Sequence, residues 1–193
     1  MKPLHRSLPL ILILLGMAGS ADAAGPDPTS IPAPGTIAPA FGLHTLLGKR
    51  TKGDDERPVL ELDGFCGMRP EATRAVVVAF VDVGSDADLA VLNGWYKKHH
   101  KAGLEILAVS EAEDGEAFAS SLERAGLKFP LLDDRMGIVA SRYGVPNSPF
   151  SFLMDASCRV LGFSNRSVVA DQATLGASIE AQLKGQLGTM DPE

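Results

Sequence analysis

The sequence predicts an α/β domain whose central sheet is covered by helices on both faces. Residues 75–81 and 104–110 are continuously apolar and rich in β-branched side chains, which is typical of strands buried on both faces. A helical pattern follows each of these segments, and a strand hairpin with a closing helix completes the chain. Alternation of this kind favours a sheet layered between helices.

Short elements are expected before residue 75. Phe41 and Leu43 alternate with small or polar neighbours, which predicts a short strand. Glycine and proline interrupt the apolar residues between 58 and 74, so no long element is expected there.

Helices are expected after both buried strands. The first covers residues 86–100, although the glycine after Asn93 weakens the pattern. A second is expected near residues 116–124. The stretch 129–133 is interpreted as a short link into a third helix near 136–143.

The C-terminal third predicts a hairpin and an amphipathic helix. Residues 150–155 and 160–163 flank a short turn, as in two antiparallel strands. Asp171 comes near the start of the closing helix, whose apolar side chains recur every four residues. They are Leu175, Ile179, Leu183 and Leu187.

The N-terminus has the pattern of a secretory signal peptide over residues 1–23. A basic start precedes a short apolar run and a small-residue end at Ala23. The alternative is a membrane anchor, which needs ~20 apolar residues and is disfavoured by this length. We therefore expect an exported protein, periplasmic or secreted, with no membrane insertion after cleavage. Five prolines make residues 24–39 a linker, followed by a domain over 40–188 and a tail over 189–193.

The charge balance is acidic, with 24 acidic and 18 basic residues in the whole chain. Cleavage after Ala23 removes Lys2, Arg6 and Asp22, which leaves 23 acidic and 16 basic residues. A negative surface disfavours nucleic acid as a partner, because both carry the same sign. No cofactor or metal is expected.

Several stretches together resemble the redoxin and TlpA-like branch of the thioredoxin superfamily, which is AhpC/TSA-related. They are residues 38–43, 48–49, 76–80, 107–110, 129–133 and 143–155. The resemblance covers residues 36–187. It implies a thioredoxin-like fold, with a central mixed sheet, helices on both faces and an N-terminal extension.

The resemblance also implies where reactive cysteines would stand. In that family the segment after the central strand reads Phe-Trp-Ala-x-Trp-Cys-x-x-Cys, and alignment from Phe80 puts its cysteines at Ser85 and Asp88. The peroxiredoxin pattern Pro-x-x-x-Thr-x-x-Cys is absent as well. Thiol–disulfide exchange requires a thiolate, which neither residue provides. The resemblance therefore implies an oxidoreductase scaffold without catalytic residues at this position.

The segment from Ser85 to Asp88 has a structural interpretation and two functional ones. Ser85 and Asp88 have the spacing of a helix capping box, and Asp86 suits the positive end of the helix dipole. A metal site using Asp82, Asp86 and Asp88 is one alternative. A nucleophile at Ser85 is the other, but no base is evident. The histidines considered for that role are His44, His99 and His100.

Pro149 matches the cis-proline that faces the redox helix in that family. Relatives hold an extended peptide there, so the resemblance implies a binding face. Its expected residues are Ser85, Asp86, Asp88, Ser148 and Pro149. The leading hypothesis is a non-catalytic module that binds a protein, a peptide or a small ligand.

Cys66 and Cys158 are the two cysteines of the chain. In an oxidising compartment an even pair is usually bonded. The strand directions of the implied fold put both at the end of the sheet opposite Ser85. A structural disulfide is expected. The alternative is a relocated redox pair, which would make the chain a thiol–disulfide oxidoreductase or a peroxide reductase.

Overall fold

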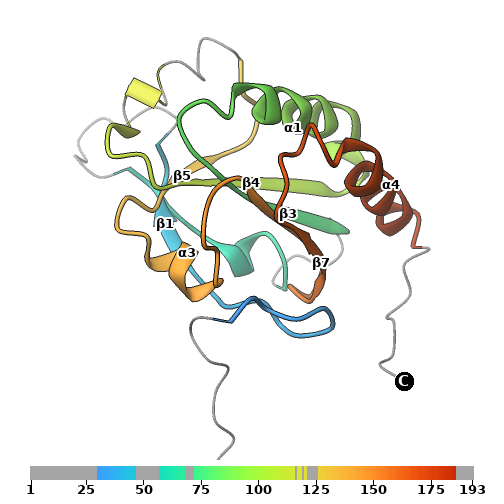
Figure 1. The fold of residues 1–193 in the computed structure, drawn as a ribbon. Coiled ribbons are helices and arrows are strands. Elements are labelled where there is room, and N and C mark those ends of the chain that lie inside the picture. The colour runs from blue at the N-terminus through green and yellow to red at the C-terminus, as the bar shows by residue number, and fades with distance from the viewer. Residues whose placement is uncertain are drawn as a thin grey trace, which may run out of the picture.

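The computed structural model describes residues 30–46, 57–67, 72–115, 117, 118, 120 and 126–185. The expected signal peptide and C-terminal tail lie outside these residues. Figure 1 shows a central sheet with helices on both faces, so the predicted fold class is confirmed. In chain order the elements are β1 (Gly42–His44), β2 (Val59–Glu61), η1 (Leu62–Gly64), β3 (Ala75–Val81), α1 (Asp86–His99), η2 (His100–Ala102), β4 (Leu104–Ser110), β5 (Leu131–Asp133), α3 (Ile138–Arg142), β6 (Phe150–Asp155), β7 (Val160–Ser164) and α4 (Gln172–Leu183).

The main sheet has five strands in the order β5-β4-β3-β6-β7. β3, β4 and β5 are parallel, whereas β6 runs antiparallel to β3 and β7 antiparallel to β6. Every residue of β3 is buried, as its continuous apolar run predicts. Because Phe80 pairs with Phe150, the start of β6 lies beside the end of β3.

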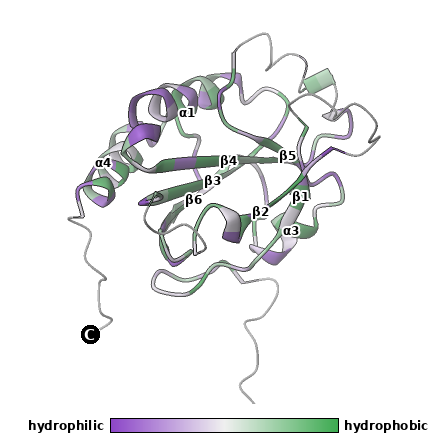
Figure 2. Cartoon of the chain, turned by 180° about the vertical axis from the view of Figure 1, so that it is seen from behind, coloured by the Kyte–Doolittle hydropathy of each residue, from purple (hydrophilic) through white to green (hydrophobic). Residues whose placement is uncertain are grey.

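Two hydrophobic layers cover the two faces of the sheet. Val77 and Ala79 of β3 pack in one layer with apolar residues of α1 and α4. Val76 and Val78 pack in the other layer with the residues around β1 and α3. Figure 2 shows the strands between these layers mainly in the green of apolar residues. No helix among the described residues combines the length and apolarity required to cross a bilayer.

Three segments differ from the sequence prediction. The sequence predicts a link over residues 129–133, but Leu131–Asp133 form β5, which pairs in parallel with β4. The helix predicted near 136–143 is the shorter α3. The first helix ends at His99 and continues as η2, and its glycine does not break it. The helix expected at 116–124 lies mostly outside the described residues.

The N-terminal part contributes a small sheet of its own. β1 pairs antiparallel with β2, a three-residue strand in a stretch where the sequence predicted no long element. The described part of the expected linker, residues 30–39, is attached to the domain. Val160 donates its N–H to the carbonyl of Thr36 (2.8 Å), and Gly35 donates to the carbonyl of Val160 (2.8 Å). The domain boundaries stay predictions.

Cys66 and Cys158 form a disulfide, with 5.2 Å between their Cα atoms. The pairing predicted from the strand directions is therefore confirmed. The bond lies at the end of the sheet opposite Ser85, and backbone hydrogen bonds surround it. The N–H of Gly67 donates to Ala156 (2.7 Å), and that of Ala38 donates to Cys158 (2.8 Å).

Candidate functional site

The candidate site begins at the turn that joins β3 to α1. Gly84 has a φ of 102° in this turn, a value that glycine adopts without a steric penalty. Ser85 and Asp88 follow, and both are buried, with 8% and 5% of their surfaces exposed. Asp86 lies between them in the first turn of α1 and is exposed.

The capping box predicted for Ser85 and Asp88 is wrong, since neither side chain caps α1. The Ser85 hydroxyl points back into the turn, where it accepts the N–H of Asp82 (3.2 Å) and donates to its carboxylate (3.2 Å). Asp88 reaches a distant segment instead, because its carboxylate accepts the N–H of Val169 (2.9 Å). The serine thus closes the β3–α1 turn, and the aspartate ties α1 to the loop before α4.

The second half of the site is the loop before β6. The Ser148–Pro149 peptide bond is cis, as the resemblance implied. Both residues are half-buried. Since Phe150 pairs with Phe80, this loop lies beside the end of β3, next to the turn that holds Ser85. The residues expected to form a binding face therefore lie at the same end of the sheet.

Exposed apolar side chains flank this end of the sheet, and sequence reasoning did not identify them. Val83 in the β3–α1 turn is 71% exposed, and Val169, whose own N–H binds the Asp88 carboxylate, is 46% exposed. Phe163 of β7 is half-exposed and stacks on Phe150, with 5.7 Å between the ring centroids. No alternation in the sequence singles out Phe163, because Val160, Leu161 and Phe163 are all apolar and the register of β7 shifts opposite Leu153 and Met154.

Comparison with known proteins identifies the family. The profile of the AhpC/TSA family matches residues 71–170, which is more than half of the chain. The chain belongs to the AhpC/TSA family. This finding confirms the resemblance to redoxins drawn from the sequence.

Individual relatives agree with this AhpC/TSA assignment. The thiol-disulfide oxidoreductase ResA of Geobacillus thermodenitrificans (strain NG80-2) is 29% identical over 153 residues, covering 78% of this chain and 80% of the relative. ResA of Geobacillus kaustophilus (strain HTA426) is 35% identical, and the match covers 65% of this chain and 66% of the relative. A crystal structure assigned as thiol:disulfide interchange protein DsbE from Chlorobium tepidum superposes with a TM-score of 0.61. It is 24% identical and covers 79% of this chain and 99% of the other.

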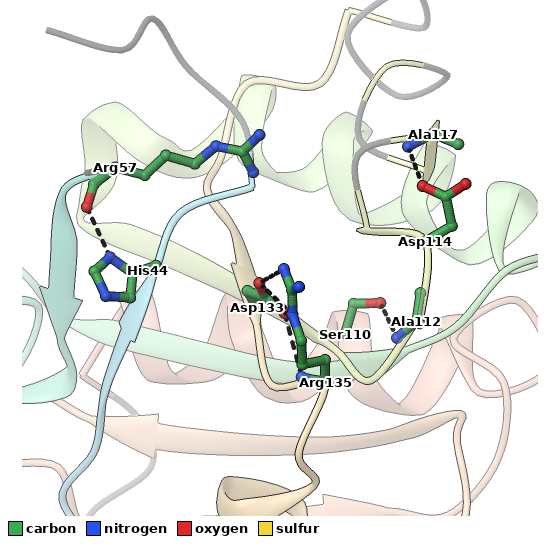
Figure 3. Close-up of polar contacts among 8 residues, drawn as sticks. All are labelled: His44, Arg57, Ser110, Ala112, Asp114, Ala117, Asp133 and Arg135. Carbon is green, nitrogen blue, oxygen red and sulfur yellow. Dashed lines mark hydrogen bonds and ion pairs between the residues drawn. The ribbon is translucent and has the colours of Figure 1, made fainter. Parts of the chain in front are cut away.

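The nucleophile hypothesis for this AhpC/TSA member finds no histidine base among the described residues. The hydroxyl of Ser85 contacts Asp82 and no histidine. His44 lies in β1 and donates to the carbonyl of Arg57 (2.8 Å; Figure 3). His99 and His100 stand at the other end of α1, about 20 Å away along the helix axis.

The metal hypothesis is also without structural support. Within the described residues, no three His, Cys, Asp or Glu side chains are placed to hold a metal ion together. Three carboxylates lie near one another at this end of the sheet. Burial raises the pKa of Glu111 at the end of β4, and the negative charges of Asp134 and Asp82 raise it further.

Proposed function

We propose that this protein is an exported thioredoxin-like module that binds an extended protein or peptide segment and carries out no thiol–disulfide exchange at Ser85 and Asp88. The observation that carries the proposal is the hydrogen bond between the Asp88 carboxylate and the Val169 N–H. Asp88 aligns with the second redox cysteine of the family, and its buried carboxylate connects α1 to the loop before α4. Neither side chain can cycle between oxidation states.

A binding role is supported by exposed apolar side chains at the start of α1. Val83 precedes this helix and Val169 is hydrogen-bonded to Asp88 in its first turn, and both side chains are exposed. Exposed apolar side chains held beside one another favour contact with a partner. A peptide lying against this end would cover them and leave the interior of the domain unchanged.

Export is supported by two independent features. Residues 1–23 have the basic, apolar and small-residue order of a signal peptide. Cys66 and Cys158 are bonded, and such a bond persists in oxidising compartments outside the cytosol. The proposal covers a periplasmic or a secreted location.

An insulin-reduction assay with dithiothreitol tests the absence of exchange. We expect no turnover above the rate of dithiothreitol alone. The named relatives are thiol-disulfide oxidoreductases, so the competing function is exchange through Cys66 and Cys158. Turnover that disappears in Cys66→Ser would establish that competing function and overturn ours.

Binding is tested with a probe that cannot exchange disulfides, the reduced and carboxymethylated insulin B chain. Titrated into isotope-labelled protein, it should shift the backbone amide resonances of Ser85, Asp86 and Ser148. Val83→Ser should weaken this binding, whereas Val59→Ser, an equally conservative change on exposed β2, should leave it unchanged. Shifts absent at millimolar probe, or equal effects of both variants, would contradict a binding face here.

A further inference from the structure

A cleft of about 390 Å³ is lined by residues of β2 and β4. β2 contributes Val59–Glu61, and β4 contributes Glu105. The rest of the described lining comes from the segment between β2 and β3, namely Gly64, Phe65, Ala72 and Thr73. A volume of this size is at the lower end of the range for ligand-binding clefts. None of the residues around Ser85 and Pro149 lines the cleft, so it is separate from the candidate site.

The part of the lining that β4 supplies is a half-buried carboxylate. Glu105 is the second residue of this strand, and Leu104 and Ile106 on either side of it are fully buried. Burial raises the pKa of Glu105, so its ionised form is unfavourable in the folded protein. A carboxylate that is held beside a cleft at a cost to the stability of the fold is a candidate binding group.

His100 holds Glu105 in position. Its Nδ1 lies 3.3 Å from a carboxylate oxygen of Glu105 and 3.3 Å from the carbonyl oxygen of Leu104. Its Nε2 lies 3.5 Å from the hydroxyl of Tyr96, which keeps its proton because burial and the charge of Glu105 raise the pKa of Tyr96. These partners suit the neutral imidazole, with its proton on Nδ1 and with Nε2 accepting from the phenol. A neutral imidazole leaves the negative charge of Glu105 available to a ligand.

The lining combines a second carboxylate with apolar side chains. Glu61 is exposed at the end of β2, and the described lining contains no Lys, Arg or His. Val59 is 50% exposed, and Leu60 and Phe65 are half-buried. A ligand complementary to these groups carries positive charge on an apolar chain, since charged groups form the stronger hydrogen bonds and the apolar surface remains to be covered.

We propose that this cleft binds an aliphatic diamine, with one ammonium group against Glu105 and the other against Glu61. The alkyl chain between the two ammonium groups covers Leu60 and Phe65. A lysine side chain of a partner protein carries a single ammonium group, so the two carboxylates of the lining favour the free diamine. Binding is noncovalent, and this second site is independent of the proposed function at the other end of the sheet.

The test titrates 1,5-diaminopentane into isotope-labelled protein of the complete sequence and follows the backbone amide shifts. The diamine should shift the amides of Leu60, Phe65 and Glu105. Pentylamine keeps one ammonium group and should bind about fivefold more weakly, and the uncharged 1,5-pentanediol should cause no shifts. The blocked peptide acetyl-Gly-Lys-Gly-amide should bind no more tightly than pentylamine. Tighter binding of this peptide than of the diamine would assign the cleft to a partner's lysine and overturn the proposal.

Variants separate charge recognition from folding. Glu105→Gln should weaken binding of the diamine about fivefold and abolish its advantage over pentylamine. This variant removes an unfavourable buried charge, so lost binding cannot result from unfolding. Glu113→Gln should preserve the advantage, because Glu113 is an exposed carboxylate that follows the opposite end of β4 and does not line the cleft. Equal affinities of the diamine and pentylamine for the unmodified protein, undiminished binding to Glu105→Gln, or shifts only outside the lining would overturn the proposal. None of these outcomes bears on the insulin-chain titration.

Discussion

Removing the disulfide is the perturbation whose effect can be worked out most directly. Cys66 and Cys158 are 92 residues apart in sequence, so the bond closes a loop that contains about half of the chain. In the chain-entropy account, cross-linking a loop of this length destabilises the unfolded state by about 4 to 5 kcal/mol. The double variant Cys66→Ala/Cys158→Ala should lose most of that free energy of unfolding. Its unfolding temperature should then fall by about 10 °C or more.

The conformation of Cys158 gives a second, smaller effect. Its φ is 59°, in the left-handed region that is unfavourable for residues with a Cβ atom. Cys66→Ala/Cys158→Gly should therefore be more stable than the double alanine variant, by about 1 kcal/mol. Circular dichroism during heating, without reductant, measures both differences on the same scale.

Two controls decide whether this reasoning is right. The unmodified protein, fully reduced by dithiothreitol, should unfold at nearly the same temperature as the double alanine variant. Non-reduced peptide mapping should show the link between Cys66 and Cys158. Free thiols in protein taken from its export compartment, or an unchanged unfolding temperature of the double alanine variant, would refute it.

Three further predictions concern Asp88, the redox positions and Glu105. Asp88→Ala should lower the free energy of unfolding by about 1–3 kcal/mol, because it leaves the Val169 N–H without its acceptor. Asp88→Asn keeps an acceptor oxygen and should recover part of that lost free energy. Denaturant titrations measure both changes. Ser85→Cys/Asp88→Cys should create a reducible pair of thiols. The thiol at position 85 precedes α1 and should have a pKa below that of an ordinary cysteine. A pKa of about 8.5 or above for that thiol would contradict this prediction. Burial raises the pKa of Glu105, and nearby His100 opposes that shift. Because a raised pKa makes the ionised form unfavourable in the folded state, stability falls as the pH rises from the ordinary glutamate value through the raised one. Glu105→Gln should thus unfold at a higher temperature than the unmodified protein at neutral pH and at the same temperature below about pH 4, as melting curves across that range would reveal.

The long elements of the fold could be predicted because each carries its own pattern. β3 and β4 are continuous apolar runs, and the β6–β7 hairpin brackets a short polar turn. β2 and β5 have only three residues each, too few for periodicity to distinguish a strand from a loop. Both are strands because β1 and β4 supply their hydrogen-bond partners, which lie 15 or more residues away in sequence.

The sequence by itself determined which chemical groups the candidate site contains. The positions of Ser85 and Asp88 carry a hydroxyl and a carboxylate, and neither carries a thiol. The cysteines of the chain are Cys66 and Cys158. Only the tertiary structure decided what these groups contact. Ser85 and Asp88 have the spacing of a capping box, yet Asp88 binds Val169, 81 residues further along the chain. A side chain points toward the partner that folding brings to it, and local spacing cannot specify that partner.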